Sequence, residues 1–296
     1  MKAGFIGMGA MGEPMARNLH TAGLLVGVYN RTAKRARDFA AETGVKACDD
    51  PAALAAECDV VVTCVSADAD VLAVVDAMLG NIRPGSVVVD CSTVKSDTAS
   101  EAADRLAKVE AAFLDCPVSG GTEGAEKGTL AMMCGGDEKA LEKAMPVLEC
   151  MAGRIVHMGP VGAGQATKAV NQIMVAGINQ AVTEGLAFAE AMDLPLDKVI
   201  DVVGGGAAGS WFLAHRGPNM VRGRFPLGFK VSLHEKDLEI CREMADKLGV
   251  ALPVIEMTLL HYQRVIDAGY GDNDISALYA LKQELFRQGA KDKSGA

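Results

Sequence analysis

Apolar positions in the first half of the chain alternate between short runs rich in β-branched residues and longer stretches with a repeat of three to four residues. The short runs are apolar at nearly every position, which is typical of strands buried on both faces of a parallel sheet. The longer stretches have the spacing of amphipathic helices. Strands are predicted at residues 3–6, 25–29, 59–65, 86–91, 112–117, 129–134 and 154–158, and helices at 11–22, 32–42, 97–108 and 137–151.

The second half lacks this alternation. Residues 165–192 are predicted to form one long helix of about 42 Å, with small and apolar residues on most of its circumference. Further helices are predicted at 196–203, 211–221, 229–248, 253–268 and 275–286. We therefore expect an α/β fold: an N-terminal, Rossmann-type, doubly wound sheet over residues 1–162 and an all-α domain over 163–296, joined by the long interdomain helix.

A glycine-rich turn lies between the first predicted strand and the first predicted helix. In the pattern G-x-G-x-x-G, Gly7 permits the tight turn, Gly9 lets the backbone approach a pyrophosphate, and Gly12 lets the helix pack on the strand. The N-terminus of that helix offers N–H groups to phosphate. The turn predicts a dinucleotide site formed by Gly7, Met8, Gly9, Ala10, Met11 and Gly12, with a purely structural turn as the alternative.

The end of the second predicted strand distinguishes NAD from NADP. An acidic residue there accepts the ribose hydroxyls of NAD. This chain has Asn30-Arg31-Thr32 instead, whose guanidinium, amide and hydroxyl suit a 2′-phosphate that a carboxylate would repel. NADP(H) is therefore the expected cofactor, with NAD(H) possible. The alternative is that Arg31 is a solvated residue at the start of a helix.

Composition and charge narrow the class of protein. The chain has 296 residues, half of them apolar, and a net charge of −9, which disfavours nucleic acid and anionic membranes as partners. None of the eight cysteines is in a C-x-x-C pair, so we expect reduced thiols and no metal. A predicted strand that begins at residue 3 leaves no room for a signal peptide, and the expected location is cytoplasmic.

Two further segments have residues suited to chemistry. Ser119, Gly120 and Gly121 follow a predicted strand, where successive backbone N–H groups suit a carboxylate, although an ordinary turn has the same composition. Lys168 shares one helical face with Asn171 and Gln172 on the long, mostly apolar helix. A buried ammonium there could protonate a carbonyl oxygen, and a lysine whose head reaches solvent is the alternative.

Four collinear segments resemble the β-hydroxyacid dehydrogenase family. They are residues 4–12, residues 115–121 (Asp-Cys-Pro-Val-Ser-Gly-Gly), residues 164–171, and Lys236-Asp237. The resemblance extends from residue 3 to about residue 287. The family includes 3-hydroxyisobutyrate dehydrogenase, tartronate semialdehyde reductase and the glyoxylate/succinic semialdehyde reductases, each with a Rossmann domain and an all-helical domain.

The resemblance implies a role for individual residues. It makes Lys168 the catalytic acid/base and places the loop Ser119–Gly121 on the substrate carboxylate. It places Val65, Ser66, Asp70 and Thr93 against the cofactor, Lys236 near it, and Asn171, Gln172 and Asp237 at the substrate. His234 becomes a packing residue.

Two features of the resemblance indicate different substrates. Gln172 stands where 3-hydroxyisobutyrate dehydrogenases have Asn, and Lys-x-x-Asn-Gln is similar to the tartronate semialdehyde reductases. The triplet Asn30-Arg31-Thr32 is similar to the NADP-using glyoxylate and succinic semialdehyde reductases. We expect an NADP(H)-dependent reductase of short aldehyde acids of the latter type, with tartronate semialdehyde reductase or 3-hydroxyisobutyrate dehydrogenase as alternatives. A non-catalytic cofactor-binding protein is disfavoured, because such relatives lose the lysine.

The expected partners are a small hydroxy- or aldehyde-acid substrate and further copies of the chain. The small-residue surface of residues 174–191 and the apolar helices after it predict a homodimer or homotetramer.

Overall fold

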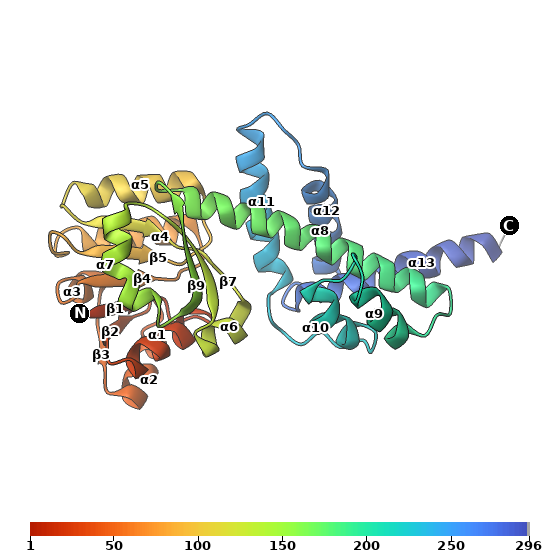
Figure 1. Ribbon diagram of the computed structural model, residues 1–296, viewed down its shortest axis with the longest axis horizontal. Coiled ribbons are helices and arrows are strands. Elements are labelled where there is room, and N and C mark those ends of the chain that lie inside the picture. Colours follow the sequence, from red (N-terminus) through yellow and green to blue (C-terminus); the bar gives the residue numbers. More distant parts are fainter. Residues whose placement is uncertain (295–296) are drawn as a thin grey trace. The chain divides into compact units, whose positions relative to one another are not determined.

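The computed structural model describes the backbone of residues 1–294 and the side chains of residues 1–288. The chain divides into two compact units (Figure 1), unit 1 over Met1–Lys168 and unit 2 from Ala169 onward. The domain boundary proposed from the sequence, between residues 162 and 163, falls at the first residue of helix α8 (Ala163–Ala191). The α/β fold class expected from the sequence is confirmed.

Unit 1 is built around one sheet with the strand order β3-β2-β1-β4-β5-β6-β8-β7, and β9 pairs with β8. From β3 to β6 all neighbours are parallel, β8 is antiparallel to β6 and β7, and β9 is parallel to β8. The strands are β1 (Ala3–Ile6), β2 (Leu25–Tyr29), β3 (Lys46–Ala47), β4 (Val60–Thr63), β5 (Val87–Asp90), β6 (Ala112–Asp115), β7 (Val118–Ser119), β8 (Leu130–Gly135) and β9 (Ala152–Gly159).

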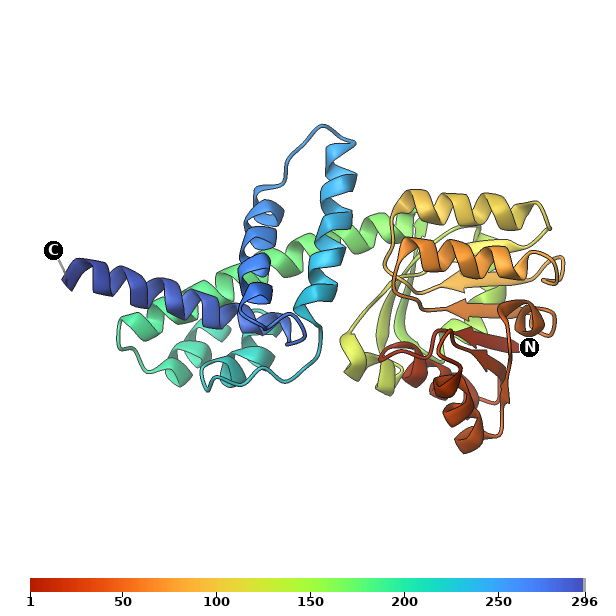
Figure 2. The same cartoon turned by 180° about the vertical axis from the view of Figure 1, so that it is seen from behind.

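Helices cover both faces of this sheet (Figures 1 and 2). Successive residues of the central strands point to opposite cores: Val60 and Val62 of β4 pack into one, and Val61 packs into the other. Burial on both faces is the reason these strands are continuously apolar. The first core is covered by α1 (Gly12–Thr21), α2 (Ala33–Thr43), α6 (Gly121–Lys127) and α7 (Glu138–Leu148), and the second by α3 (Pro51–Ala55), α4 (Asp68–Met78) and α5 (Ser96–Ala107).

The periodicity missed several elements of unit 1. α4 contains the run Val71-Leu-Ala-Val-Val75, which is apolar at every position and therefore has no amphipathic signature. The two-residue strands β3 and β7 are too short to produce an alternation. The sheet is not parallel throughout, because β6 and β7 both run antiparallel to β8: the chain reverses its direction between β7 and β8, where α6 lies.

Unit 2 is all-helical, as predicted. It contains α8 from Ala169 onward and the later helices α9 (Leu196–Gly204), α10 (Trp211–Met220), α11 (Val231–Asp246), α12 (Pro253–Asp267), the 3₁₀ turn η1 (Ile275–Ala277) and α13 (Leu278–Ser294). Its core is packed around Leu238, Ile255, Tyr262 and Tyr279. Over the described residues, no helix combines the length and apolar character needed to cross a bilayer.

Candidate functional site

The glycines of the turn after β1 serve two purposes: two of them are needed for the fold, and one leaves space for a ligand. Gly7 has φ +101°, and a Cβ there would lie 2.1 Å from the carbonyl oxygen of Cys64. A Cβ on Gly12 would lie 1.8 Å from the carbonyl oxygen of Gly7. Both glycines are thus required by the fold. Around Gly9, in contrast, no atom of the described residues other than Gly9 and its two chain neighbours lies within 4 Å of the Cβ position, so its backbone is open to a ligand. This opening fits the pyrophosphate of a dinucleotide.

Asn30 fixes the conformation of this turn. Its Oδ1 accepts a hydrogen bond from the N–H of Met8 (2.8 Å), and its Nδ2 donates to the carbonyl of Thr32 (3.0 Å). The N–H of Gly7 donates to the carbonyl of Tyr29 (3.0 Å). The end of β2 and the glycine turn are therefore one hydrogen-bonded structure. The side-chain amide of Asn30 connects the glycine turn to the residues that follow β2.

Two arginines follow the end of β2. Arg31, whose side chain is 80% exposed, pairs with Asp70 of α4 at 2.5 Å between Nη1 and Oδ1. Arg35 of α2 donates to the carbonyl of Met8 (3.2 Å). A cavity of about 450 Å³ borders the turn, lined by Met8, Gly9, Ala10, Glu13, Arg35, Asp38, Phe39 and Glu42. The predicted NADP contact Arg31 and the predicted cofactor contact Asp70 are thus brought together as an ion pair.

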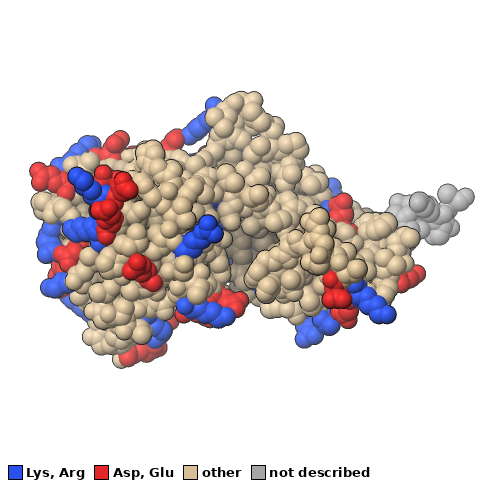
Figure 3. All heavy atoms as spheres, viewed as in Figure 1, with Lys and Arg blue, Asp and Glu red and all other residues tan. Residues whose placement is uncertain are grey.

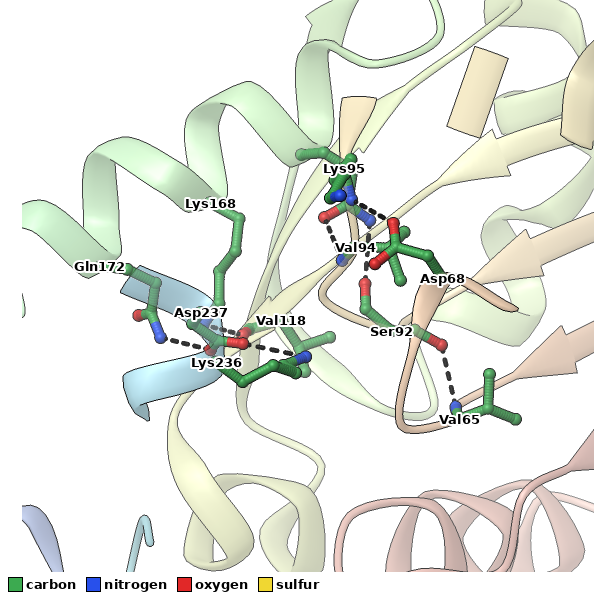
Figure 4. A network of polar contacts seen from close by, with 11 residues as sticks. Val65, Asp68, Ser92, Val94, Lys95, Val118, Lys168, Gln172, Lys236 and Asp237 are labelled. Carbon is green, nitrogen blue, oxygen red and sulfur yellow. Dashed lines mark hydrogen bonds and ion pairs between the residues drawn. The ribbon is translucent and has the colours of Figure 1, made fainter. Parts of the chain in front are cut away.

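The carboxyl ends of β4 and β5 are tied together by a buried carboxylate that the sequence analysis missed. Asp90 Oδ1 accepts hydrogen bonds from Thr63 Oγ1 (2.7 Å) and Ser92 Oγ (2.6 Å). Ser92 Oγ in turn accepts from the N–H of Val65 (2.8 Å; Figure 4). The predicted cofactor residues Val65, Ser66 and Thr93 lie in the loops that this network holds. The signal was present, since Asp90 ends an otherwise apolar run.

Lys168 is buried in unit 1, with 7% of its surface exposed. Its Nζ donates a hydrogen bond to the carbonyl oxygen of Val118 (2.8 Å; Figure 4). Val118 directly precedes Ser119, Gly120 and Gly121, and both glycines have positive φ, +135° and +63°. The structure therefore places the ammonium group at the carbonyl next to the predicted carboxylate-binding loop. A buried ammonium at a defined acceptor differs from the solvent-reaching lysine that was the alternative.

A second missed carboxylate, Asp115, holds the start of the helix that bears Lys168. Its Oδ1 accepts from the N–H of Gly162 and its Oδ2 from the N–H of Gln165, both at 2.8 Å. Burial raises the pKa of Asp115 to about 6, although these two N–H groups act in the opposite direction. At neutral pH the group is mainly an ionised carboxylate facing two donors.

The site residues predicted in unit 2 form one polar chain, of which Figure 4 shows Gln172, Asp237 and Lys236. Asn171 Nδ2 donates to Gln172 Oε1 (2.8 Å), and Gln172 Nε2 donates to Asp237 Oδ2 (2.7 Å). Lys236 Nζ lies 3.0 Å from Asp237 Oδ1. His234, expected to pack, does so: it is fully buried, with Nδ1 2.8 Å from the hydroxyl of Tyr262. The predicted roles of all these residues stay predictions.

The donors in this chain suit a dinucleotide and an organic acid. Over the part of the chain that the structure describes, there is no group of three or more histidine, cysteine, aspartate or glutamate side chains that could hold a metal ion. The roles predicted for the glycine turn, the lysine and the serine-glycine loop are those that a nicotinamide-dependent oxidoreductase combines.

Both halves of the chain match described protein families. Residues 2–159 match the NAD binding domain of 6-phosphogluconate dehydrogenase. Residues 162–282 match a family described as "NAD-binding of NADP-dependent 3-hydroxyisobutyrate dehydrogenase".

Individual relatives agree with these families. An uncharacterized oxidoreductase of Shewanella frigidimarina is 40% identical over 89% of this chain and 92% of its own length. Glyoxylate/succinic semialdehyde reductase 1 of Arabidopsis thaliana is 29% identical over 94% and 97%. Among solved structures, Mycobacterium tuberculosis 3-hydroxyisobutyrate dehydrogenase with L-serine superimposes with a TM-score of 0.86 at 33% identity, covering 95% of this chain and 98% of that one.

Proposed function

Because the chain belongs to the NAD(P)-dependent β-hydroxyacid dehydrogenase family, we propose that it is an NADP(H)-dependent reductase of short aldehyde acids, of the glyoxylate and succinic semialdehyde type. The chain is an oxidoreductase that acts on CH–OH groups with a nicotinamide cofactor. The observation that carries the catalytic part of the proposal is the position of Lys168 Nζ, 2.8 Å from the Val118 carbonyl and next to the Ser119–Gly121 loop. The substrate type and the cofactor preference rest on Asn30-Arg31-Thr32 at the end of β2.

In this proposal Lys168 is the acid and base of the reaction. The bound nicotinamide supplies or accepts the hydride at the carbon of the substrate. Lys168 Nζ transfers a proton to the carbonyl oxygen in reduction and takes it back in oxidation. Its positive charge also stabilises negative charge that develops on that oxygen before the proton arrives. Burial strengthens both effects, because the ammonium interacts in a medium of low dielectric constant.

The Ser119–Gly121 loop orients the substrate. Its backbone N–H groups and the hydroxyl of Ser119 are suited to a carboxylate, and the positive φ of Gly120 and Gly121 turns successive peptide groups in a way that other residues rarely adopt. The loop starts one residue after the carbonyl that holds Lys168 Nζ. A substrate with a carboxylate and a carbonyl only a few atoms apart can therefore reach both groups at once.

Arg31 supports NADP(H) as the preferred cofactor. The end of β2 has no acidic residue, Arg35 bonds to the Met8 carbonyl in the glycine turn, and Arg31 directly follows Asn30, whose amide also bonds to that turn. Asp70 weakens that preference, because its carboxylate neutralises Arg31 and repels a 2′-phosphate. We therefore propose a preference for NADPH with measurable use of NADH.

The proposal is tested by kcat/KM for glyoxylate, succinic semialdehyde, tartronate semialdehyde and 3-hydroxyisobutyrate, each with both cofactors. The expected result is the highest kcat/KM for glyoxylate or succinic semialdehyde with NADPH. A highest value for 3-hydroxyisobutyrate, or equal values with NADH and NADPH, contradicts the substrate or the cofactor proposal respectively.

A second function, 3-hydroxyisobutyrate dehydrogenase, is favoured by the TM-score of 0.86 with the M. tuberculosis enzyme. Tartronate semialdehyde reductase is favoured by Gln172, whose amide bonds to Asp237 in this chain. The same panel of substrates separates these functions. A non-catalytic role is disfavoured by Lys168, which such proteins lack.

We further propose that the chain forms a homodimer or homotetramer through an α8–α12 patch. We define this patch as Val170, Met174, Ile178, Val254 and Met257, which are 37–64% exposed. The three α8 residues are four apart and so lie on one face of the helix. In unit 2, charged side chains are sparse over α8, α11 and α12 in the view of Figure 3. The net charge of −9 supports the proposal that neither nucleic acid nor an anionic membrane is a partner, and the proposed location is cytoplasmic.

A further inference from the structure

The first turn of α8 is capped by a side chain from a distant strand. The first N–H groups of a helix have no partner within the helix and need acceptors from elsewhere. Gly162 precedes α8 and Gln165 is its third residue, and both donate to the carboxylate of Asp115 at the end of β6. A typical N-cap side chain belongs to the residue before the helix. Here the cap lies 47 residues earlier in the chain.

Two glycines allow the helix to approach this carboxylate closely. A Cβ on Gly164 would lie 2.3 Å from the carbonyl oxygen of Asp115, and a Cβ on Gly135 would lie 2.4 Å from Asp115 Oδ1. Both positions therefore exclude any side chain. The start of α8 is seated directly on the β6 and β8 backbone, so a shift of Asp115 displaces the helix.

Gln165 provides a second attachment for the same turn. It is 2% exposed, its Nε2 donates to the carbonyl of Ser92 (2.8 Å), and its Oε1 accepts from the N–H of Val94 (3.2 Å). These bonds fix the rotation of the helix about its axis, because Gln165 and Lys168 are three residues apart and share a face.

One short segment of the chain thus binds α8 twice. Asp115 accepts a hydrogen bond from the backbone N–H of Gln165. Three residues further along both segments, the carbonyl of Val118 accepts one from Lys168 Nζ. We propose that Asp115 is a positioning residue for the reaction: it acts through Lys168 by fixing the first turn of α8 against β6. This inference rests on the proposed role of Lys168 as acid and base. It adds a fully buried residue, Asp115, to which the sequence assigned no role.

A helix cap that only stabilises the fold would be an ordinary explanation, and the chain offers a matched control. Asp137 caps α7 in unit 1, where its Oδ1 accepts from the N–H of Ala140 (3.0 Å). Neither Asp137 nor α7 contributes a residue to the proposed site. Asp137 is exposed and directly precedes its helix, whereas Asp115 is buried and distant, so Asp137→Ala controls for the loss of an aspartate cap as such and leaves the contacts of Lys168 in place.

The test is a double-mutant cycle on the full chain. Single-turnover oxidation of bound NADPH by glyoxylate is measured for Asp115→Ala, Lys168→Ala and the double variant, with melting temperature and NADPH affinity measured in parallel. Because a misplacement of about 1 Å costs roughly 100-fold, Asp115→Ala is expected to slow the reaction about 100-fold when Lys168 is present. In the Lys168→Ala background it should change the residual rate less than about twofold, since the two residues act as one unit.

Conservative and control variants complete the experiment. Asp115→Asn retains one acceptor oxygen and is expected to be intermediate, with a loss of about tenfold. It replaces Asp115→Ala in the cycle if the alanine variant does not fold. Asp137→Ala is expected to lower the melting temperature while leaving the rate within about twofold in both backgrounds.

The possible outcomes test the positioning role of Asp115 separately from the acid and base role of Lys168. Equal losses from the Asp115 substitution in both backgrounds, or no loss in either, overturn the positioning role. A Lys168→Ala variant that retains the parent rate instead overturns the role of Lys168.

Discussion

The glycine turn at residues 7–12 and the first turns of α8 at residues 162–168 are both loop-to-helix junctions at the edge of the same sheet, yet they are built differently. In the glycine turn, the need for glycine is explained by contacts within the turn or with a neighbouring strand segment, such as the contact between the Gly12 Cβ position and the Gly7 carbonyl. At α8, the acceptors come from Asp115 and Val118, about 50 residues earlier.

The difference has a consequence for function. The glycine turn presents backbone to a cofactor, so its chemistry is contained in a short motif. The start of α8 presents one ammonium group, whose position depends on contacts made across the sheet. Substitutions in the turn should therefore act on folding or on cofactor binding, and substitutions around α8 should act on the rate of reaction.

The largest expected effect distinguishes two glycines of the same turn. In Gly12→Ala the new Cβ would meet backbone at 1.8 Å, so we expect loss of folded protein. In Gly9→Ala the Cβ would meet no described atom within 4 Å, so the melting temperature should stay within about 2 °C. Its methyl group instead occupies the space of the pyrophosphate, and NADPH affinity should fall about 100-fold. Thermal unfolding with and without NADPH measures both, and a destabilised Gly9→Ala variant that binds NADPH normally would reverse the assignment.

The next effect concerns assembly of unit 2. Met174→Lys places an ammonium in the α8–α12 patch, and burying it against a second copy without a partner is costly. We expect the dissociation constant of the oligomer to rise at least about 30-fold. Light scattering during size-exclusion chromatography measures this. Val202→Lys, at an apolar residue that is 73% exposed outside the patch, is the control. Unchanged assembly in Met174→Lys rules out the patch as the interface.

A smaller effect tests the ion pair beside the glycine turn. Asp70→Asn removes the carboxylate that neutralises Arg31, so the affinity for NADPH should increase about fivefold and that for NADH by less than twofold. Asp76 lies on α4 like Asp70 and pairs with Arg105 of α5, so Asp76→Asn should change neither the NADPH affinity nor the NADH affinity. Fluorescence titration with both cofactors provides the values. A loss of NADPH affinity in Asp70→Asn would mean that Asp70 itself binds the cofactor.

The smallest effect is in the pH dependence of stability. Burial raises the pKa of Asp115 from 3.8 to about 6, so the folded state binds its proton more tightly than the unfolded state. The ionised form therefore destabilises the fold above pH 6, and this penalty is relieved as the pH falls through 6 toward 3.8. Relative to Asp115→Asn, the parent should gain about 1 kcal/mol of unfolding free energy between pH 7 and pH 5. Urea unfolding at both pH values checks this, and a constant difference between the two proteins contradicts it.

The fold was predictable where local pattern and burial agree. The runs at β4 and β5 are apolar at every position because both faces of the sheet are covered, and the glycine turn has its own motif. α4 was missed because it is apolar around much of its circumference, and β7 because two residues show no alternation.

The site was predictable only in part. The sequence singled out Lys168 and the Ser119–Gly121 loop, because an ammonium in an apolar helix and successive glycines after a strand are unusual in composition. The structure brings the two together at the Val118 carbonyl, and their roles stay predictions. Asp115 and Asp90 were not assigned a role, although each is an aspartate at the end of a buried strand. Their partners are backbone N–H groups and hydroxyls brought close by the sheet, and no local spacing encodes such contacts.

The central claim is that a lysine held at the Val118 carbonyl performs the acid and base chemistry. It is tested most directly by the single-turnover rate of glyoxylate reduction in Lys168→Ala beside Lys143→Ala, since Lys143 Nζ also donates to a backbone carbonyl, that of Gly85, at 2.6 Å. We predict a loss of about 10²- to 10⁴-fold for Lys168→Ala, with NADPH affinity within about twofold, and a parent rate for Lys143→Ala. A Lys168→Ala variant that reduces glyoxylate at the parent rate would contradict the account.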